Sequence, residues 1–210
     1  MNRLENWFCS TNFWRRLTQQ RLVPWMLEGS DPGDSALELG AGPGAATPEL
    51  LRRFSHVTSL EYDATFAAKL SSAAKISFAQ PQRAPRRNTG GAMRVAHGSF
   101  HVVQGDATQL PFADASFSCA MAILMLHHLG SPELQDRALS EIYRVLQPGG
   151  VLLIFEINNG WLQRWIHKRS RFVPMNASTA NARLNTAGFA RVTVDFLRGG
   201  FLLRARRGAG

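Results

Sequence analysis

The stretch of sequence that decides the fold lies at residues 36–45 and reads ALELGAGPGA. It begins as a short apolar strand and continues into Gly40, Gly42 and Gly44 at alternate positions. Glycine has no Cβ and adopts positive φ readily, so this turn can be tight and a ligand can lie against its backbone. A helix is expected from about residue 48 to 54, with its N-terminus at the same place. Because dinucleotide-binding folds place glycines at the same strand-to-helix turn, this stretch alone indicates a ligand site and not a class of ligand.

Three later segments have the pattern of parallel strands with a ligand at their carboxyl ends. VTSLEYD at residues 57–63 is a β-branched and apolar run that ends in acid, and FHVVQGDA at residues 100–107 repeats the pattern. The third begins with an apolar run at residues 118–129, and RVLQPGG at residues 144–150 then leads into a further strand at 151–156. In doubly wound folds this edge of the sheet holds the ligand, and a carboxylate there can accept both hydroxyls of a ribose.

Together these segments carry a family resemblance. The motifs ELGAGPG, LEYD, GDAxxLPFxDxSF and RVLQPGG, in this order, resemble those of the class I S-adenosylmethionine-dependent methyltransferases, in particular the small-molecule group similar to the ubiquinone/menaquinone-biosynthesis methyltransferases. The resemblance covers roughly residues 34–156. It implies an α/β fold with a Rossmann-like, seven-stranded, mostly parallel sheet, an antiparallel last strand and helices on both faces. Residues 177–187 accordingly read as the final helix with Gly188 as its stop, and residues 191–197 and 201–206 as a hairpin.

The resemblance also implies S-adenosyl-L-methionine as the cofactor and a set of residues that bind it at the strand ends. Those that border the methionine half are Glu38, Gly40, Gly42 and Gly44. The others are Glu61 at the ribose, Tyr62 against the adenine, Asp106 and the Ala107 backbone at the adenine edge, and Ala122 and Ile123 beside the sulfonium.

The expected reaction is an in-line displacement in which positioning brings the acceptor atom to about 3–3.5 Å from the methyl carbon. If a proton must be removed, His127 is the favoured base, because it follows the fourth strand at the ligand edge and histidine titrates near neutral pH. If side chains still alternate where the strand ends, His127 and His128 point to opposite sides. The alternative is that both histidines cap the strand or pack on the next helix. Glu156, at the end of the fifth strand, is the second catalytic candidate, with a salt bridge or a helix cap as an equally open role.

Length and composition fit a single domain. A chain of 210 residues with 45% hydrophobic content can bury one substantial core, so residues 1–210 are expected to form one methyltransferase domain. Residues 1–33 are expected to form a helical lid over the cofactor cleft or, with equal weight, to cover the sheet edge. Residues 76–99, rich in Pro, Arg, Gly and Asn, are expected to be a flexible insertion loop, either functional or merely tolerated. Residues 158–169 read as a short basic amphipathic helix that touches a membrane surface, caps a hydrophobic substrate or packs on its own domain.

The remaining expectations concern partners. A small, partly hydrophobic molecule is the expected methyl acceptor. The net charge of +9 raises the alternatives of RNA or other nucleic acid as substrate and of a methyltransferase fold that binds without catalysis. Nucleic acid is less favoured because the arginines are dispersed and no N/D-P-P-Y/F motif or Pro-Cys pair occurs. A Rossmann oxidoreductase is disfavoured because no Tyr-x-x-x-Lys pair occurs.

The expectations about a metal site and about the cellular location rest on motifs that the sequence lacks. The fourth strand ends in Ala122-Ile123 without an acid, and no Cys-x-x-Cys pair occurs, so no metal is expected. No apolar run of about 18 residues occurs, and the N-terminal residues lack the pattern of a secretory signal. With two cysteines and no metal spacing between them, the expected location is the cytoplasm.

Overall fold

The computed structural model describes residues 7–79, 98–158, 160, 172–197 and 199–208. Within these residues the chain forms one seven-stranded sheet in the order β3-β2-β1-β4-β5-β7-β6. The strands are β1 (Ser35–Leu39), β2 (His56–Glu61), β3 (Ser99–Gln104), β4 (Phe117–Ile123), β5 (Leu146–Ile157), β6 (Phe189–Leu197) and β7 (Gly200–Arg207). The helices are α2 (Asn12–Leu17), η1 (Thr18–Leu22), α3 (Val23–Leu27), α4 (Thr47–Arg53), α5 (Ala64–Ala79), η2 (Leu126–His128), α6 (Pro132–Val145) and α8 (Ala177–Thr186).

The first five strands pair in parallel, and β7 runs antiparallel to both of its neighbours, β5 and β6. This arrangement confirms the predicted fold class, including the antiparallel last strand. The carboxyl ends of β1, β2 and β4 meet at one edge of the sheet because parallel strands in adjacent positions end on the same side. The glycine-rich stretch lies at that edge, directly after β1.

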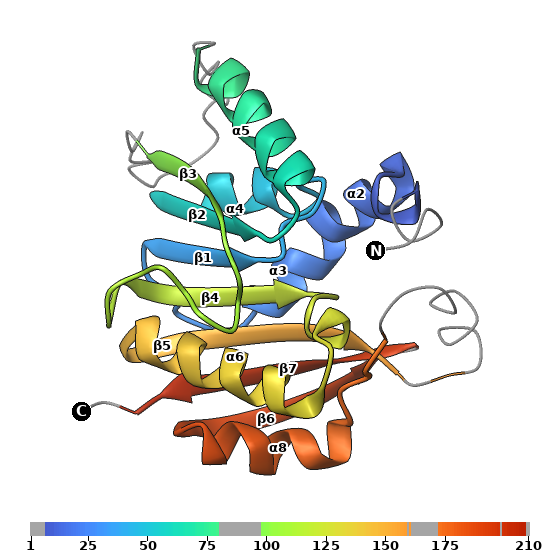
Figure 1. Ribbon diagram of the computed structural model, residues 1–210, viewed down its shortest axis with the longest axis vertical. Helices are drawn as coiled ribbons and strands as arrows, with labels where there is room; N and C mark the ends of the chain where they lie inside the picture. The colour runs from blue at the N-terminus through green and yellow to red at the C-terminus, as the bar shows by residue number, and fades with distance from the viewer. Residues whose placement is uncertain (1–6, 80–97, 159, 161–171, 198, 209–210) are drawn as a thin grey trace.

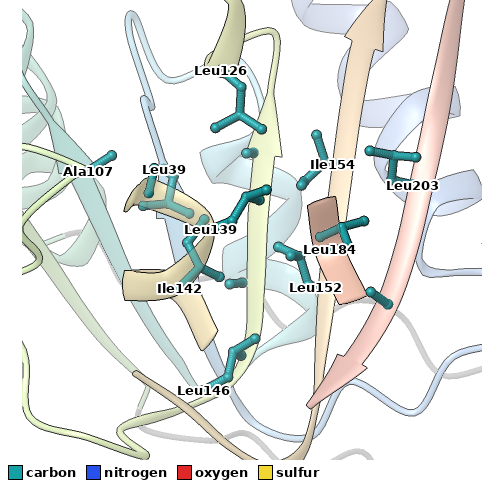
Figure 2. Packing of buried hydrophobic residues seen from close by; sticks show 14 of the residues in the cluster. Leu39, Ala107, Leu126, Leu139, Ile142, Leu146, Leu152, Ile154, Leu184 and Leu203 are labelled. Carbon is teal, nitrogen blue, oxygen red and sulfur yellow. The ribbon is translucent and has the colours of Figure 1, made fainter. Parts of the chain in front are cut away.

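Both faces of the sheet are covered, and alternation along the strands divides the core in two (Figure 1). On one face, Leu152 and Ile154 of β5 pack with buried side chains of α6 and α8, the cluster shown in Figure 2. On the other face, Val151 and Leu153 of the same strand pack with side chains of α3 and α4. Because successive strand residues point to opposite faces, one apolar run supplies both layers.

The N-terminal helical segment is part of this second layer. Its side chains Trp14, Leu22, Val23, Met26 and Leu27 are buried in the cluster that covers the sheet. Segment 1–33 therefore contributes to the core through its described residues, while its role as a lid remains a prediction.

Several element boundaries differ from the expected ones. Helix α5 continues to Ala79 and β3 begins at Ser99, so both ends of the predicted 76–99 loop belong to regular elements. Residues 80–97, the rest of that loop, and residues 161–169 of the predicted amphipathic helix lie outside the described part. Strand β5 begins at Leu146 and so includes the Pro-Gly-Gly sequence that was expected to precede it.

Candidate active site

The three glycines of the turn after β1 all have positive φ, +67° at Gly40, +53° at Gly42 and +77° at Gly44, but their surroundings differ. A Cβ at Gly40 would lie 2.4 Å from Cγ of Met125, and one at Gly44 would lie 2.6 Å from Cδ1 of Leu70. A Cβ at Gly42 would meet no atom within 4 Å. Thus a Cβ at Gly40 or Gly44 would overlap a side chain inside the protein, whereas Gly42 is the position where the turn faces open space that a ligand can fill.

Glu61 connects this turn to the end of β2. Its Oε2 accepts a hydrogen bond of 2.7 Å from the Gly42 N–H, and its Oε1 accepts one of 2.9 Å from the Asp63 N–H. The carboxylate is buried. Each carboxylate oxygen has a second acceptor site, so Glu61 can hold the turn and still receive ribose hydroxyls, as its predicted role requires.

Glu38 lies beneath the turn and joins three elements. Its Oε2 accepts hydrogen bonds from the hydroxyls of Thr47 in α4 (2.8 Å) and Ser59 in β2 (2.5 Å). Burial raises the pKa of the Glu38 carboxyl to about 7; the two hydroxyls oppose this effect, and the negative charge of Glu61 adds to it. Sequence reasoning missed Thr47 and Ser59. The available signal was a serine in the interior of a predicted strand, and this serine lies opposite Glu38 in the sheet register.

The three residues predicted at the adenine differ in their exposure. Tyr62 is 75% exposed, so its ring is available to cover a planar ligand. The Asp106 carboxylate accepts hydrogen bonds of 2.8 Å from both the N–H and the hydroxyl of Thr108, and in this way closes its own turn. Ala107 is buried in the core cluster (Figure 2).

The end of β4 places a strained residue beside the predicted sulfonium positions. Ala122 is buried and Ile123 is half-buried, and the next residue, Leu124, has φ of +54°. A bulky side chain rarely adopts this conformation, and such outliers concentrate at functional sites. The strained turn brings Met125 under Gly40. Neither Leu124 nor Met125 was predicted from the sequence, and no sequence pattern marks a leucine with positive φ.

His127 and Glu156, predicted as separate catalytic candidates, form one hydrogen-bonded pair. Nδ1 of His127 lies 2.6 Å from Oε2 of Glu156, and the Leu126 N–H donates to Oε1 at 2.8 Å. His127 is 2% exposed and Glu156 is fully buried. Glu156, near the carboxyl end of the buried strand β5, thus orients the imidazole of His127 in η2, which follows the neighbouring strand β4.

The expectation that His127 and His128 point to opposite sides was wrong. Both belong to the 3₁₀ turn η2, where strand alternation does not apply, and their ring centroids lie 4.2 Å apart. Burial distinguishes them instead, since His127 is buried and His128 is only half-buried.

Gln135 is a further buried polar residue that sequence reasoning missed. Its Nε2 donates to the carbonyl oxygens of Leu126 (3.1 Å) and Val173 (2.7 Å), while the Val173 N–H donates to the carbonyl of His127 (2.9 Å). These bonds fix the backbone of η2 against the segment that precedes α8. The position of the His127 ring is therefore supported from two sides, by Glu156 and by this backbone network.

Among the residues that the structure describes, no group of three or more His, Cys, Asp or Glu side chains is arranged to hold a metal ion. In the same part of the chain, every helix is too short or too polar to span a bilayer.

The strand order, the open glycine turn and the carboxylate at the end of β2 are those of the class I S-adenosylmethionine-dependent methyltransferase family. Residues 37–154, more than half of the chain, match the family described as a methyltransferase domain, and the chain belongs to that family. Its residues fit the cofactor of this class, because the turn is open at Gly42 and a carboxylate stands beside it.

Relatives and solved structures agree with this assignment. The chain is 29% identical over 150 residues to the ubiquinone/menaquinone biosynthesis C-methyltransferase UbiE of Vibrio cholerae, covering 71% of this chain and 49% of that protein. It is 31% identical over 145 residues to a demethylmenaquinone methyltransferase of Beutenbergia cavernae, covering 69% of this chain and 47% of that protein. The chain thus spans about half the length of these curated relatives. Its fold is similar to that of the N-methyltransferase NodS from Bradyrhizobium japonicum in complex with S-adenosyl-L-homocysteine, with a TM-score of 0.67 at 18% identity, covering 96% of this chain and 91% of that chain.

Proposed function

We propose that this protein catalyses transfer of a methyl group from S-adenosylmethionine to a small, partly hydrophobic acceptor, and that His127, oriented by Glu156, receives the acceptor's proton. The observation that carries the proposal is the buried His127–Glu156 pair. His127 of this pair lies two residues after Met125, the residue packed beneath Gly40. A proton-accepting group therefore lies close along the chain to the turn that would hold the cofactor.

When bound, the cofactor supplies an electrophilic methyl group on a positively charged sulfur. The residues that would hold it are the Gly42 turn, Glu61 at the ribose, and Tyr62 with the 106–107 turn at the adenine. The end of β4, Ala122 and Ile123, would border the reacting centre. The enzyme's own contribution is then to position the acceptor and to exclude water from it.

The proton would be handled by the imidazole of His127. A hydrogen bond from Nδ1–H to Glu156 selects one tautomer, in which Nε2 carries the lone pair of the neutral ring. Glu156 is held in place by the Leu126 N–H and would stabilise the imidazolium that forms when the proton is taken. Such a pair suits acceptors with an acidic O–H or C–H, and the relatives named as C-methyltransferases are consistent with the latter.

The proposal is tested in two steps. Titration calorimetry with S-adenosylmethionine, NAD and an unstructured RNA in parallel should show binding of S-adenosylmethionine alone. Binding of NAD would favour an oxidoreductase, and binding of RNA would favour the nucleic-acid alternative. Release of S-adenosylhomocysteine is then measured with phenolic and carbon-acid acceptors. If no acceptor of either kind accelerates its release while the cofactor binds, the catalytic part of the proposal fails.

A further inference from the structure

The N-terminal helices present a surface that is both apolar and basic. We call it the N-terminal surface and define it by exposed residues of the first helical segment: Trp7, Phe8, Phe13, Arg15, Arg16, Leu17 and Arg21. Trp7 is 65% exposed and Phe13 is 69% exposed. Two large aromatic side chains on one short segment expose an unusual amount of apolar area for a protein in water, which marks a site of interaction.

The core fixes the orientation of this surface. Trp14, Leu22 and Met26 point from the same segment into the buried cluster against the sheet. Phe13 and Leu17, four residues apart, face outward and line an open hollow of about 380 Å³ together with Arg16 and Arg21. Because the segment already buries its other side, it cannot turn to hide the exposed aromatics. Within the described part of the chain they therefore stay exposed.

The charge of the N-terminal surface indicates what that partner is. Residues 7–27 contain three arginines and no aspartate or glutamate. A second copy of the chain would bring the same positive charge against itself, which disfavours self-association. Aromatic side chains beside arginines suit the interface of an anionic bilayer, where the rings sit at headgroup level and the guanidinium groups meet lipid phosphates.

We propose that the N-terminal surface binds the surface of anionic lipid bilayers, with Phe13 and Leu17 entering the interface. The contact is peripheral and concerns a part of the molecule outside the catalytic pair, so it holds whichever acceptor is methylated.

The position of this surface gives the contact a consequence for access to the site. Nε2 of Gln19 donates a 3.0 Å hydrogen bond to the carbonyl of Ala45, at the end of the glycine turn. Figure 1 shows α2 on the side of the molecule to which β4 points, where the cofactor edge lies. Docking through α2 would therefore bring that edge close to the lipid, where a partly hydrophobic acceptor is concentrated.

Co-sedimentation of the full chain with vesicles tests the proposal. We expect binding to vesicles of equimolar phosphatidylcholine and phosphatidylglycerol, and little binding to phosphatidylcholine alone. The double variant Phe13→Ser, Leu17→Ser should bind at least about tenfold more weakly. The double variant Arg16→Gln, Arg21→Gln should lose roughly fivefold per arginine and most of its salt dependence.

Matched controls lie elsewhere on the surface. Phe196→Ser removes a 68% exposed aromatic from β6, and Arg137→Gln removes an exposed arginine from α6; both should bind vesicles like the parent. Thermal melting and S-adenosylmethionine calorimetry on every variant check the fold and keep this test separate from the proposed function. The proposal is overturned if the parent does not bind anionic vesicles, if the controls lose as much binding as the N-terminal variants, or if Phe13→Ser, Leu17→Ser converts a dimer to a monomer without affecting lipid binding.

Discussion

Replacing Glu38 by glutamine should remove a specific component of the pH dependence of stability. In the folded protein, burial raises the pKa of this carboxyl from its ordinary 4.5 to about 7. Between these two values the folded state therefore holds more protons than the unfolded chain. The free energy of unfolding must then fall as pH rises through this window, since the charged carboxylate is tolerated less well in the folded state.

The size of the effect follows from the two pKa values. At about 1.4 kcal/mol per pKa unit, the difference corresponds to roughly 3 kcal/mol of stability lost between about pH 4.5 and about pH 7. Glutamine keeps an oxygen that can accept from the hydroxyls of Ser59 and Thr47 but carries no charge. Relative to the parent, Glu38→Gln should therefore gain about that amount of stability across the window, on top of any constant offset from its amide N–H groups.

Urea unfolding followed by tryptophan fluorescence, at intervals from about pH 5 to about pH 8, measures this difference. The useful quantity is the variant's stability minus the parent's, because contributions from all other titrating groups cancel. Glu133→Gln is the matched control: a hydrogen bond from the Ser131 hydroxyl lowers the pKa of Glu133 from its ordinary 4.5, so this group affects the pH dependence only at lower pH, and the control's stability should run parallel to the parent's across the measured range. Parallel stability curves for Glu38→Gln and the parent would refute the argument that burial dominates at Glu38.

Further predictions concern the cofactor and the proton. Gly42→Val should abolish S-adenosylmethionine binding in calorimetry with the fold retained, because the added side chain would occupy the space of the ligand. A valine at φ of +53° is strained, so a lowered melting temperature is expected, whereas an unchanged dissociation constant would contradict the assignment of this turn. Glu61→Ala should weaken cofactor affinity by roughly 1.5–3 kcal/mol, the range for hydrogen bonds to a charged group, with little change in turnover at saturating cofactor. If Asp63→Ala has this effect instead, the ribose carboxylate has been misassigned by two positions. His127→Ala should lower turnover by about 10²–10⁴ with cofactor affinity nearly intact, and His128→Ala much less; full activity of His127→Ala would leave positioning as the only catalytic effect.

The sequence predicted those site residues whose role is indicated by the residues adjacent to them in the chain. Gly42 lies in a glycine run after an apolar strand, and Glu61 ends a β-branched strand, so both were predicted at the cofactor edge. The structure adds that they bond to each other. The glycine pattern itself could not reveal that Gly40 and Gly44 are needed for packing, because the neighbours that demand a missing Cβ, Met125 and Leu70, are far away in the chain.

Other features depend on contacts between distant elements and were not predictable from local patterns. His127 and Glu156 were each singled out as a candidate, but their pairing depends on the relative position of two strands and the turn η2. The prediction that His127 and His128 point to opposite sides assumed the side-chain alternation of a strand. It was wrong because the chain leaves β4 through a strained residue, Leu124, and then forms a 3₁₀ turn. The register between β1 and β2, which places Ser59 beside Glu38, is likewise a property of the assembled sheet.

The place of β7 in the sheet bears on how the protein is made. Among the strands that the structure describes, β7 is the last in sequence, yet it lies inside the sheet, and β6 contacts the sheet only through it. During synthesis, β1 to β5 can pair as they emerge from the ribosome, whereas β6 has no partner until residues 200–207 have followed it. A nascent chain that stalls before this point carries an unpaired, apolar β5 edge, the kind of strand that recruits other chains. Chaperones that shield sheet edges would therefore act on this domain mainly between the synthesis of β5 and the synthesis of β7.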